Sequence, residues 1–282
     1  MSVVVRGLVL AYHAQNCGGF EYADNDHIAF AADLVAIARR QLPLVPLGSV
    51  ASALAEGAVE KLPPRFVALS CDDGTLLDWR DYEHPEFGLQ RALANILRDH
   101  LAGSSQDTRG LLTAFVIASA EARRAIDAGC YGGIPLSDDD WWAEAAREGL
   151  VSIQNHSWDH LHEVLPAELI AQGRVGDFYS VDTLAAADRQ VRQAGEAIRE
   201  RLGAYAPAEH LFAYPYGHAG DYLCADYLPA REQEHGVLAA FTTEQGFVEA
   251  DSPRYRLPRM VCGDAWSSPA QFEALLDTLQ QA

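Results

Sequence analysis

Two adjacent carboxylates lie where an apolar run ends. Asp72 and Asp73 follow the run Phe66–Ser70 closely, and Gly74 comes next. Neighbouring carboxylates repel each other unless a cation lies beside them, so a metal ion could bind one and leave the other free as a general base. An ordinary Asp-Gly turn has the same sequence. On its own, this segment is compatible with both interpretations.

Two histidines four residues apart follow a second apolar run. His156 and His160 come after Val151–Gln154. If this loop begins with a helical turn, both side chains lie on one face. Neutral imidazoles at that spacing are common zinc ligands, although surface histidines would look the same. With Asp73 they form a set of three ligands with open positions. This pattern is typical of catalytic zinc and would also suit iron or cobalt.

A third segment, Phe212–His218, reads FAYPYGH and also follows an apolar run. Pro215 restricts the backbone and Gly217 permits a tight turn. A rigid turn can direct a backbone N–H at a developing oxyanion. An aromatic turn without a function is the alternative interpretation.

The elements that carry these segments alternate between short apolar runs and helical patterns. This alternation predicts parallel βαβ units, and 282 residues without a recognisable linker predict one α/β domain over 1–282, a TIM-like (β/α) barrel. We predict strands at Val3–Ala11, Phe66–Ser70, Leu111–Ile117, Val151–Gln154, Leu211–Tyr214, Ala239–Phe241 and Arg256–Met260. We predict helices at Ile28–Gln41, Gln90–His100, Asp138–Glu148, Val181–Leu202 (with Gly203 as its C-cap) and Pro269–Leu279.

Two segments are too irregular for a predicted element: Asp78–Gly88 and Tyr216–Ala230. Each follows one of the motifs, and loops after barrel strands carry the chemistry of such folds. We therefore expect both to line the substrate groove. Four rings of the first segment could stack on a sugar or belong to a packed surface loop: Trp79, Tyr82, His84 and Phe87.

The composition limits the partners. Forty acidic and 21 basic residues give a net charge of -19, which repels nucleic acid; it favours cationic ligands, although solubility alone explains it. No apolar run approaches the roughly 18 residues that span a membrane. Arg6 interrupts the first apolar run, and no signal-peptide cleavage site follows. We expect a cytoplasmic protein without membrane or nucleic-acid partners, and leave a homo-oligomer open.

The three segments, in this order, resemble the motifs of the polysaccharide deacetylases of the NodB-homology class, carbohydrate esterase family four. Ser70–Gly74 reads S-C-D-D-G where the family has T-F-D-D-G, and residues 156–160 match H-S/T-x-x-H. Ala213–Tyr216 reads A-Y-P-Y where the family has R-x-P-Y. Order and spacing cover the chain from about Val3 to Met260.

The resemblance implies a distorted (β/α) barrel, often of seven strands, and one divalent metal, usually Zn²⁺. It implies that Asp72 is the general base, that the backbone N–H of Tyr216 holds the oxyanion and that Ser157 braces the metal loop. The implied metal ligands are Asp73, His156 and His160.

Two departures from the family pattern concern proton transfer. Ala213 replaces the arginine that pairs with the base, and loss of that cation would raise the pKa of Asp72. Arg259 is the candidate substitute. The late Leu-x-His motif that supplies the general acid is absent. His13 is the first candidate for this acid, with a purely structural histidine as the alternative, and His218 is the second candidate.

Together these features predict a metal-dependent hydrolase that removes acetyl groups from an N-acetylated sugar or related amide and releases acetate and a free amine. The predicted substrate is a carbohydrate or another small molecule. A non-sugar, cyclic amidohydrolase on the same scaffold is one alternative. A non-catalytic carbohydrate-binding barrel is the other.

Overall fold

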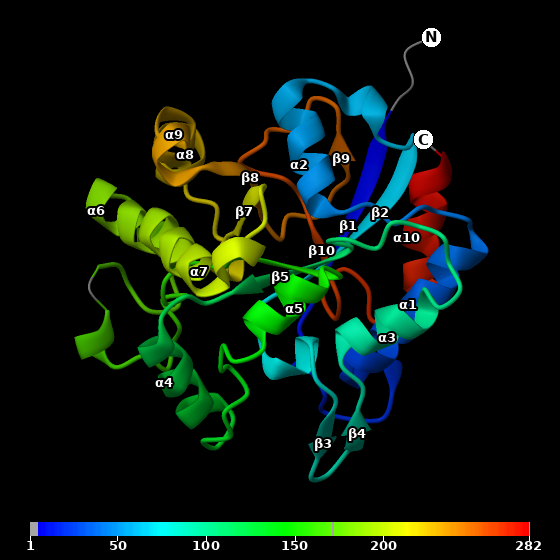
Figure 1. Cartoon of the computed structure of the whole chain (residues 1–282), viewed down its shortest axis with the longest axis horizontal. Helices are drawn as coiled ribbons and strands as arrows, with labels where there is room; N and C mark the ends of the chain where they lie inside the picture. The colour runs from blue at the N-terminus through cyan, green and yellow to red at the C-terminus, as the bar shows by residue number, and fades with distance from the viewer. Residues whose placement is uncertain (1–4, 171, 282) are drawn as a thin grey trace.

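The computed structural model describes residues 5–170 and 172–281, and its centre is a curled sheet (Figure 1). Seven strands follow in the spatial order β10-β1-β2-β5-β6-β7-β8, and each pair of neighbours is parallel. They are β1 (Arg6–Tyr12), β2 (Arg65–Cys71), β5 (Leu112–Val116), β6 (Val151–Asn155), β7 (His210–Ala213), β8 (Val237–Phe241) and β10 (Met260–Val261). β9 (Val248–Glu249) pairs antiparallel with the start of β1.

One short segment closes the sheet into a barrel. Leu257 forms a parallel bridge with Phe241 of β8, and Met260 then pairs with Leu10 of β1. The predicted strand Arg256–Met260 is therefore wrong for most of its length, because the chain crosses here from one sheet edge to the other. Pro258 lies at the crossing and has no N–H to donate to a ladder. The resulting distorted (β/α) barrel of seven strands confirms the predicted fold class.

Helices cover the barrel on opposite sides. α1, α3 and α10 lie beside β1 and β2, whereas α4, α6 and α7 lie towards β6 and β7 (Figure 1). They are α1 (Asp26–Arg39), α2 (Leu47–Glu56), α3 (Leu93–His100), α4 (Ala120–Cys130), α5 (Trp142–Glu148), α6 (Leu184–Ala187), α7 (Ala194–Leu202), α8 (Leu228–Ala230), α9 (Glu232–His235) and α10 (Pro269–Gln281). Among the described residues, no helix is long and apolar enough to cross a membrane.

The alternation of side chains along β2 explains where its acids lie. Val67, Leu69 and Cys71 pack in the cluster beneath the outer helices, while Phe66 and Ala68 pack in the cluster inside the barrel. Successive strand residues point to opposite faces, so the inward face continues through Ser70 to Asp72. Helix α2 contacts β2, β7 and β8 and so covers the interior at the opposite end of the strands.

The predicted elements differ from the structure mainly at their ends. α3 begins at Leu93 and α5 at Trp142, and the predicted helix Val181–Leu202 begins at Leu184 with a π-helical stretch over Asp188–Gln193. Gly203 adopts φ 56° at its C-cap, as predicted. The start of the predicted strand Val3–Ala11 lies outside the described residues.

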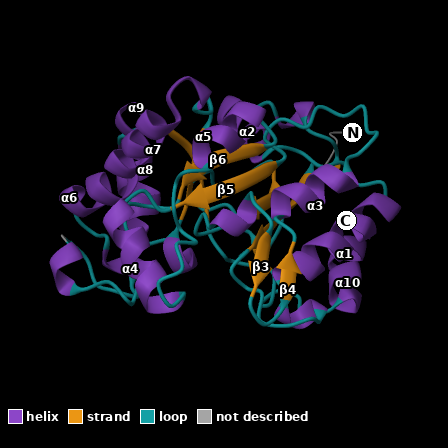
Figure 2. Ribbon diagram, turned by 60° about the horizontal axis from the view of Figure 1, so that its bottom comes forward, coloured by secondary structure: helices purple, strands orange, loops and turns teal. Residues whose placement is uncertain are grey.

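Three helices and two segments were not predicted correctly. α2, α4 and α9 were missed because few large apolar side chains mark them; the buried residues of α2, for example, include two alanines, and α9 has only four residues. Asp78–Gly88 is not irregular, since β3 (Tyr82–His84) and β4 (Gly88–Gln90) form an antiparallel hairpin that projects from the body (Figure 2). Tyr216–Ala230 is helical from Tyr222 onward.

Candidate metal centre

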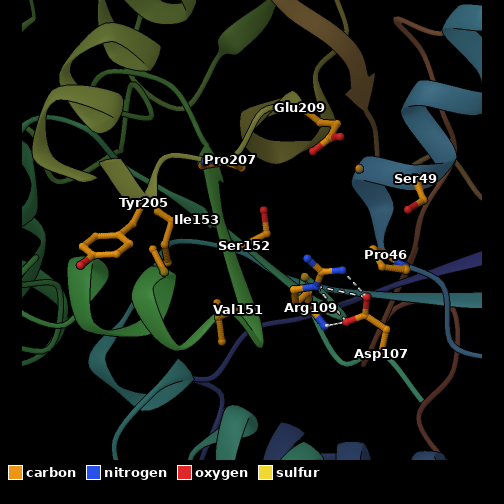
Figure 3. A pocket seen from close by; sticks show the side chains of 14 residues that line it. Pro46, Ser49, Asp107, Arg109, Val151, Ser152, Ile153, Tyr205, Pro207 and Glu209 are labelled. Carbon is orange, nitrogen blue, oxygen red and sulfur yellow. Dashed lines mark hydrogen bonds and ion pairs between the residues drawn. The ribbon is translucent and has the colours of Figure 1, made fainter. Parts of the chain in front are cut away.

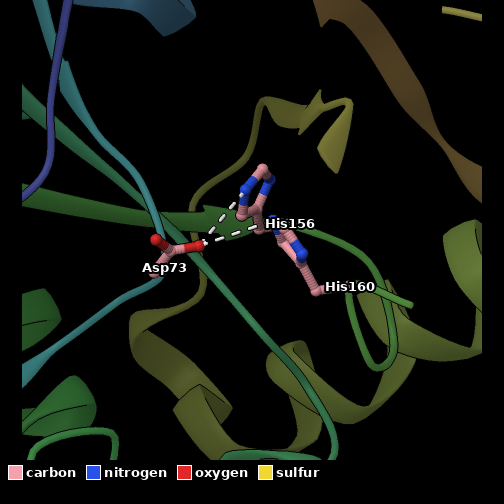
Figure 4. A group of neighbouring side chains, drawn as sticks. All are labelled: Asp73, His156 and His160. Carbon is pink, nitrogen blue, oxygen red and sulfur yellow. Dashed lines mark ion pairs between the residues drawn. The ribbon is translucent and has the colours of Figure 1, made fainter. Parts of the chain in front are cut away.

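Three side chains from the ends of two strands converge at the carboxyl end of the barrel. Asp73 follows β2, and His156 and His160 belong to the loop after β6 (Figure 4). One ligand atom from each residue lies within 4.8 Å of the other two. The Nε2 atoms of both imidazoles are 3.6 Å from Oδ1 of Asp73. A carboxylate oxygen and two imidazole nitrogens thus face one common point.

The loop that carries the histidines is not a helical turn, so that part of the sequence interpretation is wrong. Ser157, His160 and Leu161 have φ values of 76°, 63° and 46°, in the left-handed region that side chains disfavour. Two hydrogen bonds offset this strain. The Ser157 hydroxyl accepts from the His160 N–H at 2.9 Å, and Oδ1 of Asn155 accepts from the Ser157 N–H at 2.8 Å. Ser157 therefore does brace this loop.

The protonation of the imidazoles suits a cation. Nδ1 of His156 donates to the carbonyl oxygen of Ala213 at 2.9 Å, which leaves the Nε2 lone pair directed towards Asp73. Burial and the neighbouring His156 lower the pKa of His160 to about 3, so this ring is neutral. Neutral imidazoles beside an ionised carboxylate are the donors that divalent zinc-like ions take. The described side chains fit such an ion.

Beside this cluster, Asp72 is held by a buried arginine. Nη1 and Nη2 of Arg259 donate to Oδ1 and Oδ2 of Asp72 at 2.6 and 2.7 Å. Nε of the same guanidinium donates to the Thr242 carbonyl at 3.1 Å. Burial raises the pKa of Asp72, but the charge of Arg259, with a smaller electrostatic contribution from His156, outweighs it and holds the pKa well below its usual range. A cation thus faces Asp72 although Ala213 occupies the motif position.

Sequence reasoning missed Gln15. Its side-chain Nε2 donates to Oδ2 of Asp73 at 2.5 Å, which leaves Oδ1 turned towards the histidines. A carboxylate accepts only, so the amide must present its nitrogen here. Oε1 of Gln15 is buried and has no partner among the described residues. The residue lies in a loop 58 positions from Asp73, and no local pattern marks it.

The third motif forms a tight turn against the cluster. Tyr216 has φ 58°, and its ring centroid lies 4.4 Å from that of His160. Its backbone N–H donates to no acceptor among the described residues. A Cβ on Gly217 would collide with Thr243, so only glycine fits that position. The turn therefore leaves one N–H free beside the candidate metal ligands.

The two candidate acids differ in position. Burial raises the pKa of Asp73, but electrostatic interactions with the imidazoles of His160, His13 and His156 outweigh it and lower that pKa. His13 directly follows Tyr12, whose carbonyl oxygen accepts from the Asp72 N–H at 3.0 Å, so it lies beside the cluster; its own backbone N–H donates to Asp26 at 2.7 Å. His218 instead stacks on Tyr179, with ring centroids 4.3 Å apart. Of the two, His13 has the clearer electrostatic contact with the centre.

A pocket of about 550 Å³ lies at the opposite end of the barrel (Figure 3). It is lined by the segment that precedes β5 and by the starts of β6 and α2, and Arg109 pairs there with Asp107 at 2.6 Å. It shares no lining residue with the cluster of Asp73. The acids and histidines with candidate roles therefore gather at the carboxyl end.

Comparison with known proteins gives a family and a set of similar folds. Residues 60–230 match the sequence model of a family described as polysaccharide deacetylase. No curated protein sequence matches significantly.

Three solved structures resemble the whole chain. The Streptococcus pyogenes deacetylase PplD, solved in complex with acetate, is 17% identical, with 99% of this chain and 100% of that one covered and a TM-score of 0.62. IcaB from Ammonifex degensii is 15% identical, with 98% and 97% covered and a TM-score of 0.62. The deacetylase domain of BpsB from Bordetella bronchiseptica is 17% identical, with 91% and 96% covered and a TM-score of 0.54. At such low sequence identities, the similarity to these structures shows the fold alone.

Proposed function

The chain belongs to the polysaccharide deacetylase family, and from this premise we propose that it is a metal-dependent hydrolase that removes acetyl groups from an N-acetylated sugar or related amide. One observation carries the proposal. Asp73, His156 and His160 converge within 4.8 Å at the carboxyl end of the barrel. The family membership indicates hydrolysis of an amide bond, and this cluster supplies a place for it.

Asp73, His156 and His160 would hold one divalent ion, and zinc suits two imidazoles with one carboxylate best. The chemistry that such an ion supplies is polarisation of the acetamide carbonyl and activation of water for attack. Gln15 keeps the ligand oxygen of Asp73 in place through its bond to the other carboxylate oxygen. The hydrogen bond from His156 to Ala213 keeps that imidazole in the tautomer with a free Nε2.

Asp72 is the proposed general base. It is the residue next to Asp73, and its pairing with Arg259 keeps it ionised inside the barrel. An ionised carboxylate can accept the proton of the attacking water at neutral pH. Arg259 fixes both oxygens and so limits the directions from which Asp72 can accept.

Tyr216 and His13 are the proposed partners of the substrate. The free N–H of Tyr216 would donate to the oxyanion that forms on the carbonyl oxygen. His13 would then donate a proton to the leaving nitrogen, so that acetate and a free amine result. The deacetylase PplD was solved with acetate, the product that this reaction releases.

The alternatives raised from the sequence lose their main support. A cyclic amidohydrolase was credible because the motif arginine and the late histidine are missing; Arg259 pairs with Asp72 in place of the arginine, which removes one of these two reasons. A non-catalytic barrel would have no need for a strained loop that brings His160 to Asp73. We therefore favour deacetylation of a sugar.

Metal analysis and acetate release test the proposal together. We expect about one zinc-type ion per purified chain and acetate release from a panel of N-acetylated sugars and oligosaccharides. Hydrolysis of cyclic amides without acetate release would contradict deacetylation but keep the metal centre. Wild-type protein that retains no stoichiometric metal would contradict both.

A further inference from the structure

Four aromatic rings form a continuous surface across two loops near the candidate centre. We call this surface the aromatic shelf; its members are Phe20, Tyr82, His84 and Phe87. Phe20 belongs to the loop after β1, and the other three to the projecting β3–β4 hairpin (Figure 2). Phe20 meets Phe87 edge-on at 5.6 Å, and His84 stacks on Phe87 at 4.7 Å. Tyr82 meets His84 edge-on at 6.1 Å.

Buried hydrogen bonds hold the two loops together. Nδ2 of Asn25 donates to Oε1 of Gln90 at 2.8 Å, and Nε2 of Gln90 donates to the Phe87 carbonyl at 3.0 Å. The ring of His27 lies 2.7 Å from the carbonyl oxygens of both Ala14 and Arg91. These hydrogen bonds join the two loops and so hold the rings of the shelf in fixed positions relative to one another.

The phenyl ring of Phe20, at the outer end of the shelf, is open to solvent. Phe20 is 68% exposed, although the shelf holds it against Phe87. Burying a phenylalanine is favourable by roughly 1.5–3 kcal/mol, so keeping one exposed on a fixed frame indicates a binding surface.

One loop joins the shelf to the candidate centre. The loop after β1 contains His13 and Gln15, and Gln15 contacts Asp73 directly. Phe20 follows five residues later, so the chain allows at most about 18 Å between them. A ligand of several linked sugar units spans such a distance.

The Asp and Glu side chains of the two shelf segments face no lysine or arginine within those segments, and Arg91, just after the hairpin, is already paired with Asp81 and Asp99. Glu21 and Glu86 are the chain neighbours of Phe20 and Phe87, and both are exposed. Neither forms an ion pair with another described residue. Segments 13–25 and 82–90 contain no lysine or arginine. A ligand for this surface should offer apolar faces and carry no negative charge.

We propose that the aromatic shelf is a subsite for the deacetylated, cationic amino-sugar units of the chain on which the enzyme acts. This inference rests on the proposed function, since the ligand is its product. The rings would accept the C–H face of a sugar and the ammonium group by cation–π contact. Glu21 and Glu86 would complement the positive charge, and the enzyme would hold a chain by the units that it has already processed.

Binding of a β-1,4-linked glucosamine tetramer to the wild-type protein tests the subsite without any turnover. We expect Phe20→Ala or Phe87→Ala to weaken this binding about fivefold, the equivalent of one exposed cation–π contact. Tyr205→Ala is the matched control, because this half-exposed ring lines the pocket at the opposite end of the barrel. It should leave the affinity unchanged.

Charge is tested separately. The double substitution Glu21→Gln with Glu86→Gln should weaken binding of the glucosamine tetramer, as should added salt. It should not weaken binding of the N-acetylglucosamine tetramer, measured in Asp72→Asn protein to prevent hydrolysis.

No measurable binding of the glucosamine tetramer, or an affinity unchanged in Phe20→Ala, would overturn the proposal. So would binding to neutral phosphatidylcholine vesicles that Phe20→Ala abolishes, since the shelf would then contact membranes. Acetate release by the wild type is scored independently of all these outcomes.

Discussion

Arg259 and Asp72 form a buried, two-bond ion pair although 187 residues separate them in the sequence. The arginine comes from the segment that closes the barrel, and the aspartate from the end of β2. In the family pattern the cation would come from the position of Ala213 at the end of β7. The chain thus supplies a comparable charge to Asp72, the proposed base, from a different element, and this charge favours the ionised form of Asp72.

Removal of this arginine should damage both stability and turnover. Arg259→Met leaves Asp72 buried without a counter-charge, which costs about 3–5 kcal/mol for a broken buried pair. Denaturant unfolding measures the loss, and acetate release should fall with it. Ala213→Arg added to Arg259→Met should restore part of both, because the charge returns from the family position. A single Arg259→Met protein as stable and active as the wild type would refute the pairing role.

Substitution of a metal ligand and substitution of the proposed base should affect metal content and activity differently. His156→Ala should abolish both metal retention and activity, because it removes one of three ligands. Asp72→Asn should keep the metal but lower kcat by about 10²- to 10⁴-fold, the usual contribution of a general base. Metal content by mass spectrometry and acetate release measure the two properties. Full activity in Asp72→Asn would show that another group is the base.

Gln15 should tune the metal site without being a ligand. Gln15→Leu removes the donor to Oδ2 of Asp73, and metal affinity should fall by about 10- to 100-fold, as for other partners of metal ligands. Competition with a chelator measures the affinity directly. Gln106→Leu is the control, since it removes a comparable hydrogen bond, from a glutamine side chain to the Leu44 carbonyl, that involves none of the candidate metal ligands. Equal metal affinity in Gln15→Leu and the wild type would remove this role.

His13 should control the alkaline side of the pH–rate profile. A general acid must carry its proton, so the rate falls as the pH rises and the proton is lost. In His13→Ala this alkaline limb should disappear and kcat should be lower throughout. His218→Ala should retain the limb. If His13→Ala keeps the wild-type limb, the acid is another group.

Asp33 should make stability depend on pH for reasons unrelated to catalysis. Burial raises its pKa to about 7, against the hydrogen bonds that Tyr22, Tyr12 and Trp266 donate to it. The folded state therefore binds a proton that the unfolded chain releases near pH 4. The favourable contribution is complete below that pH and is lost as the pH rises towards 7, with an upper bound of about 4 kcal/mol.

Asp33→Asn should flatten this dependence, because the amide does not titrate. The free energy of unfolding, measured in denaturant between pH 4.5 and 8, should fall more steeply in the wild type than in the variant. Parallel curves would mean that Asp33 stays ionised in the folded protein.

Features that follow a strand within a few residues could be predicted from the sequence. Asp73 and His156 come just after the apolar runs of β2 and β6, and parallel strands bring their carboxyl ends to one edge. The left-handed backbone of this loop could not be inferred, because it is stabilised by hydrogen bonds that the side-chain oxygens of Asn155 and Ser157 accept from the backbone N–H groups of Ser157 and His160. Arg259 was a candidate only because Ala213 occupies the position at which the family has its arginine.

Contacts between distant loops could not be predicted. Gln15 lies in an irregular segment, and its bond to Asp73 depends on how two strands are placed side by side. The hairpin escaped prediction because β3 and β4 have three residues each, too few for a clear alternation of polar and apolar residues.

The closure of the barrel by the segment after β8 has a consequence for how the enzyme is made. This segment crosses from β8, one of the last strands of the chain, to β1, the first strand. Only this crossing brings Arg259 to Asp72. A ribosome-bound chain that has not yet exposed residue 259 would already contain Asp73, His156 and His160 but no counter-charge for its base. The charge arrangement around Asp72 is therefore completed only late in synthesis, after all three candidate metal ligands have been made.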